Sequence, residues 1–487
     1  MKAFSYLVII ACCLSSCSKW LDVKPQSEVS QDVLFSTEEG YQEALNGIYT
    51  RCTLSDSYGL EISCGFLDIL AQNYVILGSD QGGFKQTSLY NYKDAAFISR
   101  KDGAWKALYN GVANSNLILS HIEGQQKLFT GSKYALIKGE ALGLRAYFHF
   151  DALRMFAPSF VSDANAKAIP YVTTFSKQVT PLSTVGQVLD SVINDLNSAK
   201  ELLRRADPIV SAGYIVGYPI KDSSTETSGD LFLQERRHRL NFYAVCGTLA
   251  RAYLYKGDKV NALSNALEII NANKFPWTRQ NDFLNPNDEL KDRILYKELI
   301  FGWYAPTRKD DLDNRFRNTL LSLTQNTSEG QILYEVGGVG GEDYRYKQWF
   351  SERSSSTGTL LQLEKYKRDP DANIHDLMIP AIRLSEMYYI AAECTFDLDP
   401  QKAWDYFNTV RFYRGIGDAV TNEPSKDVFL NELVKECRKE FYGEGQIFYM
   451  LKRLNRAIAG PSGSTYGPSG SIFVLPLPDD EIQFGNR

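Results

Sequence analysis

The chain has 487 residues, of which 44% are hydrophobic and 23% are charged, a composition typical of a globular protein with a large apolar core. These proportions exclude a disordered chain, a collagen-like fibre and a protein that crosses a membrane many times. The formal charge of −5, from 53 basic and 58 acidic side chains, argues against nucleic acid as a partner. Tyr, Phe and Trp together make up 13% of the residues, whereas only 4 are His.

Residues 1–16 are predicted to be a signal peptide of the lipoprotein type. Lys2 provides a positive charge, and the apolar stretch 3–14 is too short to cross about 30 Å of hydrocarbon as a helix. Two serines and Cys17 follow, which resembles a bacterial lipobox. Cys17 is therefore expected to carry lipid and to anchor the protein to a membrane through the tether 17–36. An ordinary secretory cleavage site beside an incidental cysteine is the alternative.

Five further cysteines are predicted to remain in the mature protein. No two of them have Cys-x-x-Cys spacing, and several lie among apolar residues, so most are expected to be small buried hydrophobes. A Cys52–Cys64 disulfide is compatible with an exported protein but does not follow from the sequence. The five are Cys52, Cys64, Cys246, Cys394 and Cys437.

Helical periodicity follows the tether. Four amphipathic or largely apolar segments are predicted as helices, and the last of them has the most regular apolar stripe. They cover residues 37–51 with Thr37 as the N-cap, 105–122, 137–155 and 184–203.

An internal repeat predicts paired helices. Two segments share alanines and an aspartate at one offset of 141 residues, a pattern of small contact residues and short turns that is typical of tetratricopeptide repeats. The matched positions are Ala250, Asp258 and Ala262 with Ala391, Asp399 and Ala403. We therefore expect an all-α dominated fold in which tetratricopeptide-like helix pairs form a scaffold. Two long, irregular, aromatic-rich insertions, 53–100 and 274–376, are expected to interrupt it.

Short motifs in a fixed order give the chain a family resemblance. From residue 17 to residue 487 it resembles the SusD/RagB family of outer-membrane nutrient-binding lipoproteins from Bacteroidota. The motifs are WLDVKPQ at 20–26, FSTEE at 35–39, ALNGIY at 44–49, WKALYN at 105–110, EALGLRAY at 140–147, RLSEMY at 383–388, FNTVR at 407–411 and LPLP at 475–478.

The resemblance implies one SusD-like domain over residues 37–487, with an N-terminal part of about 37–235 and a C-terminal part of about 236–487. It implies a lipoprotein on the outer surface of the outer membrane that captures an oligosaccharide and delivers it to a SusC-like TonB-dependent transporter. It implies neither catalysis nor a cofactor. The alternatives are a peptide-binding member of the family and a helical-repeat interaction scaffold that binds no small ligand.

One departure from the family pattern lies near the C-terminus. Cys437, Ile447 and Met450 stand where family members often carry two arginines and an aspartate. Because charges of both signs are replaced together, we expect local repacking and an unchanged fold.

The ligand site is predicted on the two insertions. Aromatic rings pack against the C–H faces of sugars, while amides and charged groups bond their hydroxyls, so exposed aromatics beside such groups suit a glycan. Trp303→Ala and Trp349→Ala are each expected to weaken binding at least about tenfold without changing thermal stability. The predicted ligand-binding residues are Tyr58, Asn73, Tyr74, Phe84, Tyr90, Trp277, Trp303, Tyr304, Arg345, Tyr346 and Trp349.

Other chemistry finds little support. The histidines at 121, 149, 238 and 375 are too far apart in sequence for a recognised zinc motif, so no metal site is predicted. Residues 310–314 are rich in aspartate but lack the glycine and glutamate of a calcium loop, and a solvated turn is expected there. The basic run 236–239 is expected to be a short exposed face, too isolated for nucleic acid.

Overall fold

The computed structural model describes residues 30–76, 80–219, 221–318, 323–355, 358–368, 374–420 and 425–485. The predicted signal peptide, Cys17 and most of the tether lie outside these residues. None of the helices described in these ranges combines the length and the hydropathy needed to cross a membrane.

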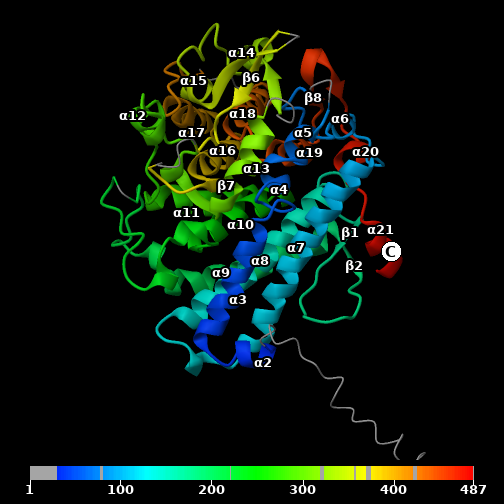
Figure 1. Cartoon of the computed structure of the whole chain (residues 1–487), viewed down its shortest axis with the longest axis vertical. Coiled ribbons are helices and arrows are strands. Elements are labelled where there is room, and N and C mark those ends of the chain that lie inside the picture. Colours follow the sequence, from blue (N-terminus) through cyan, green and yellow to red (C-terminus); the bar gives the residue numbers. More distant parts are fainter. Residues whose placement is uncertain are drawn as a thin grey trace, which may run out of the picture.

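A row of long helices forms the body of the molecule, and each helix contacts the next one in the row (Figure 1). In order, the row consists of α3 (Glu38–Cys52), α7 (Ala95–Ile122), α8 (Lys133–Phe156), α9 (Val185–Ala206), α10 (Phe242–Lys256), α11 (Lys259–Ala272), α16 (Leu384–Thr395) and α17 (Pro400–Phe412). Two further helices, α18 (Lys426–Glu440) and α19 (Ile447–Arg453), continue from α16.

Short helices occupy the connections and the ends of the chain. They are α2 (Gln31–Leu34), α4 (Glu61–Cys64), α5 (Phe66–Leu70), α6 (Lys85–Ser88), α12 (Gln280–Phe283), α13 (Lys309–Phe316), α14 (Thr327–Leu333), α15 (Tyr344–Trp349), α20 (Gly470–Phe473) and α21 (Asp479–Phe484).

Four small antiparallel sheets accompany the helices in the described part of the chain. Strand β3 (Leu299–Tyr304) of the long second insertion pairs with β7 (Met378–Arg383), which follows that insertion. Within the insertion, β4 (Thr324–Asn326), β6 (Gly358–Leu363) and β5 (Phe350–Ser355) form a three-stranded sheet. The two remaining sheets join β1 (Lys167–Pro170) to β2 (Leu182–Thr184) and β8 (Ile458–Ala459) to β9 (Thr465–Tyr466). The mainly helical fold is confirmed, although no strand was predicted.

The four predicted helices are present, with one large difference in length. The Thr37 side chain accepts a hydrogen bond from the Gly40 backbone at the start of α3, so the predicted N-cap is confirmed. Helix α7 begins at Ala95, ten residues before the predicted start, because Asp94 caps two backbone N–H groups there. The last residues of the first predicted insertion are therefore helical.

The repeated segments form paired helices, as predicted. Asp258 caps α11 and Asp399 caps α17, each by accepting the backbone N–H of the residue three positions later. The four matched alanines are fully buried, where helices of adjacent pairs approach one another. The helix pairs α10–α11 and α16–α17 are thus tetratricopeptide-like, and α11 contacts α16 although the long second insertion separates the two pairs in sequence.

The five cysteines after the tether are free and buried, so Cys52 and Cys64 form no disulfide in the structure. Burial raises the pKa of each of these thiols above its ordinary value. All five cysteines fill space in the core, as was predicted for most of them.

A buried cluster of charges connects the second insertion to the helical body. The Glu440 carboxylate of α18 accepts hydrogen bonds from Arg345 of α15 at 3.0 Å, from Arg383 of β7 at 2.6 Å and from Arg414 at 2.7 Å. All four side chains are at most 1% exposed. Although burial alone would raise it, Arg414 and Arg383 hold the pKa of Glu440 well below its ordinary value.

The three departures from the family motif lie together beside this region. Cys437, Ile447 and Met450 line one internal cavity of about 80 Å³ between α10, α16, α18 and α19. Apolar side chains therefore replace charges around a common space, and the surrounding helices stay packed. This arrangement agrees with the predicted local repacking.

Substitution of Glu440 by alanine should lower the free energy of unfolding by about 3–5 kcal/mol, because three buried arginines lose their shared partner. Equilibrium denaturation by urea measures this change. The matched control is Glu342→Ala, which removes an exposed ion pair with Lys347 and should cost less than about 1 kcal/mol. Equal effects of the two substitutions would contradict the structural role of the cluster.

Candidate ligand-binding groove

A groove of about 380 Å³ lies where α3, the segment around the 3-10 helix η5 (Arg236–His238) and the end of β3 meet. This volume falls within the range usual for small-molecule pockets, as do those of other hollows in the described structure, whereas the pocket of about 80 Å³ beside Cys437 lies well below it. The lining residues are Asn46, Tyr49, Thr50, Thr53, Gln234, Glu235, His238, Arg239, Trp303, Tyr304, Pro306 and Thr307.

Strand β3 brings two consecutive aromatic residues to the groove. Successive side chains of a strand point to opposite faces, so Trp303 and Tyr304 diverge. Trp303 is 1% exposed and Tyr304 is 42% exposed. Pairing with β7 places Trp303 opposite Ile379 and Tyr304 opposite Met378, which fixes the direction of both rings.

The Trp303 ring forms part of the groove wall and rests on the core. Its indole stacks on the Tyr58 ring with the ring centroids 4.4 Å apart and the planes at 14°. Tyr58 is held in turn by the hydrogen bond that its hydroxyl donates to Asp151 at 2.7 Å. The backing behind the groove is therefore rigid.

The exposed Tyr304 ring lies at the rim and is supported by His238. The two rings are nearly parallel, with centroids 4.8 Å apart and planes at 6°. A nitrogen of His238 is 2.7 Å from a carboxylate oxygen of Glu235. Although burial alone would raise it, this contact holds the pKa of Glu235 below its ordinary value.

Polar groups of α3 and of the segment around η5 complete the lining of the groove. The Tyr49 hydroxyl donates to Glu140 at 2.6 Å and accepts the Leu240 backbone N–H at 2.9 Å. The Arg239 guanidinium lies over the Tyr49 ring at 5.3 Å and hydrogen-bonds the Asn46 side chain. The groove thus combines an exposed ring face with an amide, a guanidinium and a carboxylate, which are the groups that bind carbohydrate hydroxyls and C–H faces.

Of the eleven predicted ligand-binding residues, Trp303 and Tyr304 line this groove and Tyr58 supports it from behind. The other eight lie elsewhere in the described structure. Ligand contact at those eight positions stays a prediction. The exposure of each side chain shows which of them a ligand can reach.

Three predicted residues of the first insertion have buried side chains. Asn73 bonds Asp68, Tyr74 packs edge-on against Tyr442, and Phe84 lies beneath the Arg100 guanidinium at 4.2 Å. In these positions the side chains fix the insertion to the helical body and present no face to solvent.

Two residues of the second insertion are fully buried. Arg345 belongs to the charge cluster around Glu440, and Trp349 donates from its indole nitrogen to the Arg293 carbonyl at 2.7 Å. The sequence favoured exposed loops here because it showed no periodicity, but this stretch has its own hydrophobic core.

Tyr90, Trp277 and Tyr346 are half-buried. Tyr90 packs against Tyr466, and Tyr346 packs against the ring of Tyr334. Trp277 stacks on Tyr413 at 4.5 Å with planes at 9°. Tyr413 borders a second, more open hollow on α17.

Sequence reasoning missed the contribution of the basic run. Arg236 and Arg237 are buried and paired with Glu140, Asp207 and Glu226, which corrects the expectation of an exposed basic face. Those buried pairs orient His238 and Arg239 toward the groove. The sequence of this run does not show which of its four basic side chains are buried, because the acidic partners of the buried ones lie about 10 to 100 positions away.

The aspartate-rich stretch 310–314 is also different from the expected turn. It forms most of α13, where Asp311 pairs with Arg308 at 2.7 Å and Asp313 pairs with Arg317 at 3.1 Å. Those ion pairs along the helix account for two of its three aspartates.

Two family models match separate parts of the chain. One, described as "Starch-binding associating with outer membrane", matches residues 19–208, and one described as "SusD family" matches residues 304–483. The first description agrees with the predicted location at the outer membrane. A SusD-like protein of Formosa agariphila is 22% identical over 94% of this chain and 92% of its own length.

Solved structures show the same fold. A SusD-like carbohydrate binding protein from Bacteroides vulgatus superposes with a TM-score of 0.70 at 19% identity, covering 92% of this chain and 96% of its own. Surface glycan-binding protein A from Bacteroides thetaiotaomicron, solved in complex with laminarihexaose, gives a TM-score of 0.63 at 18% identity and covers 92% and 98% of the two chains.

The two family models together account for most of the chain, and the segment between them forms the η5 side of the groove and continues the same helical row. The order of the motifs, the paired helices and the matched models agree with one another. The chain belongs to the SusD/RagB family.

Proposed function

We propose that this protein is a cell-surface lipoprotein that binds an oligosaccharide in the groove between α3, η5 and β3 and passes it to a SusC-like TonB-dependent transporter. The observation that carries the proposal is the exposed Tyr304 ring, held flat against His238 beside polar groups. The role is binding without catalysis, since SusD family glycan-binding proteins are non-catalytic.

The shape of the site supports a sugar chain as the ligand. One face of Tyr304 is covered by His238, so the ring is fixed in orientation and its remaining exposed surface is available to a pyranose face. Arg239, Asn46 and Thr50 belong to the same lining. A ligand that stacks on Tyr304 would therefore have hydroxyl-binding groups within the same groove.

The fixed geometry also favours affinity. Side chains that are already ordered lose little conformational entropy when a ligand binds, which leaves more of the contact energy for binding. Trp303 is backed by Tyr58, Tyr49 is held by two hydrogen bonds, and Tyr304 is backed by His238. The aromatic part of the groove is thus preorganised.

Attachment to the outer membrane is assigned to acylated Cys17 and the tether that follows it. Two or three acyl chains anchor a folded domain stably without a membrane-spanning helix, because each buried CH₂ contributes about 0.8 kcal/mol. Transfer to a transporter in the same membrane then requires only movement within the reach of the tether.

Replacement of Tyr304 by alanine should weaken oligosaccharide binding at least about tenfold, because the stacking surface is lost, and should leave the unfolding temperature nearly unchanged. Isothermal titration of the detergent-solubilised protein with a panel of oligosaccharides, starting with laminarihexaose, measures the affinity.

Tyr413→Ala is the matched control for this test. Tyr413 is 37% exposed and also stacks on one neighbour, but it borders the hollow on α17 and lies outside the groove. It should bind oligosaccharide like the unsubstituted protein. If Tyr413→Ala loses affinity and Tyr304→Ala keeps it, the ligand site lies at α17 and the proposed groove is wrong.

Replacement of Trp303 by alanine should behave differently from the sequence-based expectation. Because the indole is buried against Tyr58, we now expect a loss of about 3–5 kcal/mol in the free energy of unfolding together with weaker binding. Thermal denaturation followed by circular dichroism measures the first effect. An unchanged unfolding temperature would show that the ring does not support the core.

Replacement of Cys17 by alanine should release the protein from the membrane, because no acyl chain can then be attached. Fractionation of cells into membrane and soluble material, with detection of the protein in each fraction, measures the distribution. Cys437→Ala is the control and should stay in the membrane fraction. Retention of the Cys17 variant in membranes would contradict lipid anchoring at this position.

A further inference from the structure

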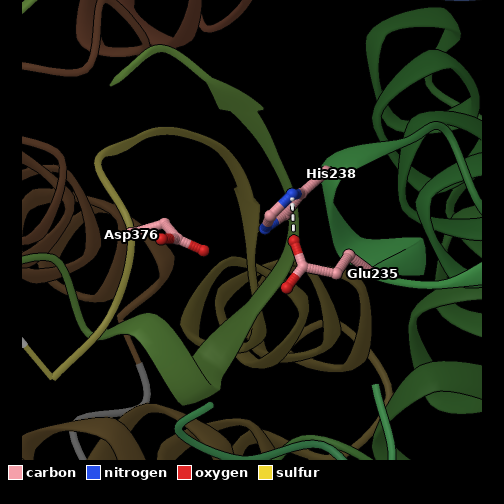
Figure 2. A group of neighbouring side chains, drawn as sticks. All are labelled: Glu235, His238 and Asp376. Carbon is pink, nitrogen blue, oxygen red and sulfur yellow. Dashed lines mark ion pairs between the residues drawn. The ribbon is translucent and has the colours of Figure 1, made fainter. Parts of the chain in front are cut away.

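Three potential metal ligands converge beside the groove. One nitrogen of His238, one carboxylate oxygen of Glu235 and one of Asp376 all lie within 4.8 Å of one another. In Figure 2, His238 lies between the two carboxylates, with one ring nitrogen joined to Glu235 and the ring edge turned toward Asp376. The cluster is half-buried and so remains open to solvent on one side.

The cluster is more than a histidine–glutamate ion pair. Asp376 comes from the segment before β7, more than 130 residues away from His238 in sequence. Within the described residues its carboxylate makes no hydrogen bond and no ion pair, whereas its backbone carbonyl accepts from Arg368. The fold therefore brings a second carboxylate to an imidazole that already has one partner.

Electrostatics favour a cation at this position. Two half-buried carboxylates this close to one another repel. The neighbouring arginines of η5 are occupied, because Arg237 pairs with Glu226 and Arg239 lies against Glu140. A bound divalent ion would neutralise both carboxylates at once.

A second, independent observation concerns the other nitrogen of the ring. His238 Nδ1 contacts Glu235 at 2.7 Å, while Nε2 is buried and has no hydrogen-bond partner among the described residues. An imidazole nitrogen with a lone pair in such a position is the usual histidine ligand of a transition metal.

We propose that Glu235, His238 and Asp376 form a binding site for a divalent transition-metal ion, with Zn²⁺ as the expected occupant. Mixed imidazole and carboxylate ligands suit zinc, which binds them at about 2.0–2.2 Å. Three protein ligands leave a fourth position for a solvent or ligand oxygen. Small side-chain rotations close the present separations, because all three residues have partly exposed side chains.

The spacing of the histidines in the sequence does not reveal this site. His238 has no second histidine nearby, and its partners are carboxylates, one of them from a distant segment. The proposal is independent of glycan binding, since it concerns the ion and these three side chains alone. Zinc binding and oligosaccharide binding can therefore fail separately.

The occupied site would also hold the rim of the groove. Tyr304 stacks on His238, so an ion that fixes the imidazole fixes the support of the exposed ring. Binding of zinc should therefore raise the unfolding temperature and reduce the modification of His238 by diethylpyrocarbonate.

The test uses the detergent-solubilised full chain after removal of metals with a chelator. Titration with ZnCl₂ in a calorimeter should show one ion per chain, and Co²⁺ in place of zinc should give a visible d–d absorption spectrum. His238→Ala should weaken zinc binding at least about 100-fold, and the nearly isosteric Asp376→Asn at least about tenfold.

Two controls keep the outcome clear. Glu342→Gln removes an exposed carboxylate that is not part of the cluster and should bind zinc normally. Circular dichroism of each variant establishes that it is folded before titration, and Asp376→Asn serves if His238→Ala does not fold. Absence of saturable binding, or equal affinity of Asp376→Asn and the unsubstituted protein, overturns the proposal.

Discussion

The burial of Glu440 among three arginines is the constraint on which the arrangement of the second insertion depends. Arg345 comes from α15, Arg383 from the end of β7 and Arg414 from the turn after α17, so one carboxylate joins three separate segments. A buried charge needs partners, and here each partner is also buried. A shift of the insertion on the helical row would therefore break the buried ion pairs of Arg345 with Glu440 and Glu436.

This constraint extends to the groove through two strands. Arg383 is the last residue of β7, and Arg414 also binds Glu298, which immediately precedes β3. Both strands are thus held at the same end by one cluster. Their pairing sets Trp303 opposite Ile379 and Tyr304 opposite Met378, so the orientation of the groove aromatics follows from ion pairs located at the other end of the strands.

Much of the helical body could be predicted from the sequence, and the insertions could not. Three local patterns form the elements that they predict: the apolar stripe of α9, the N-cap at Thr37 and the alanine repeat. The positions of Arg345 and Trp349 depend on distant partners, Glu440 and the Arg293 carbonyl, which no local pattern reveals. For the same reason the sequence predicts Tyr304 as a ligand residue together with rings that the structure shows to be buried, and offers no means to separate them.

The two rings at the end of β3 show what information was lacking. Aromatic content alone makes Trp303 and Tyr304 equivalent, but the two-residue period of a strand forces one inward and the next outward. The inward ring packs on the core and the outward ring is exposed, so in the proposed site the same dipeptide serves stability and binding. A strand assignment for 299–304 would have made this distinction from sequence. It was missed because the stretch is apolar on both faces, and such short apolar runs do not show whether they form a strand or a helix.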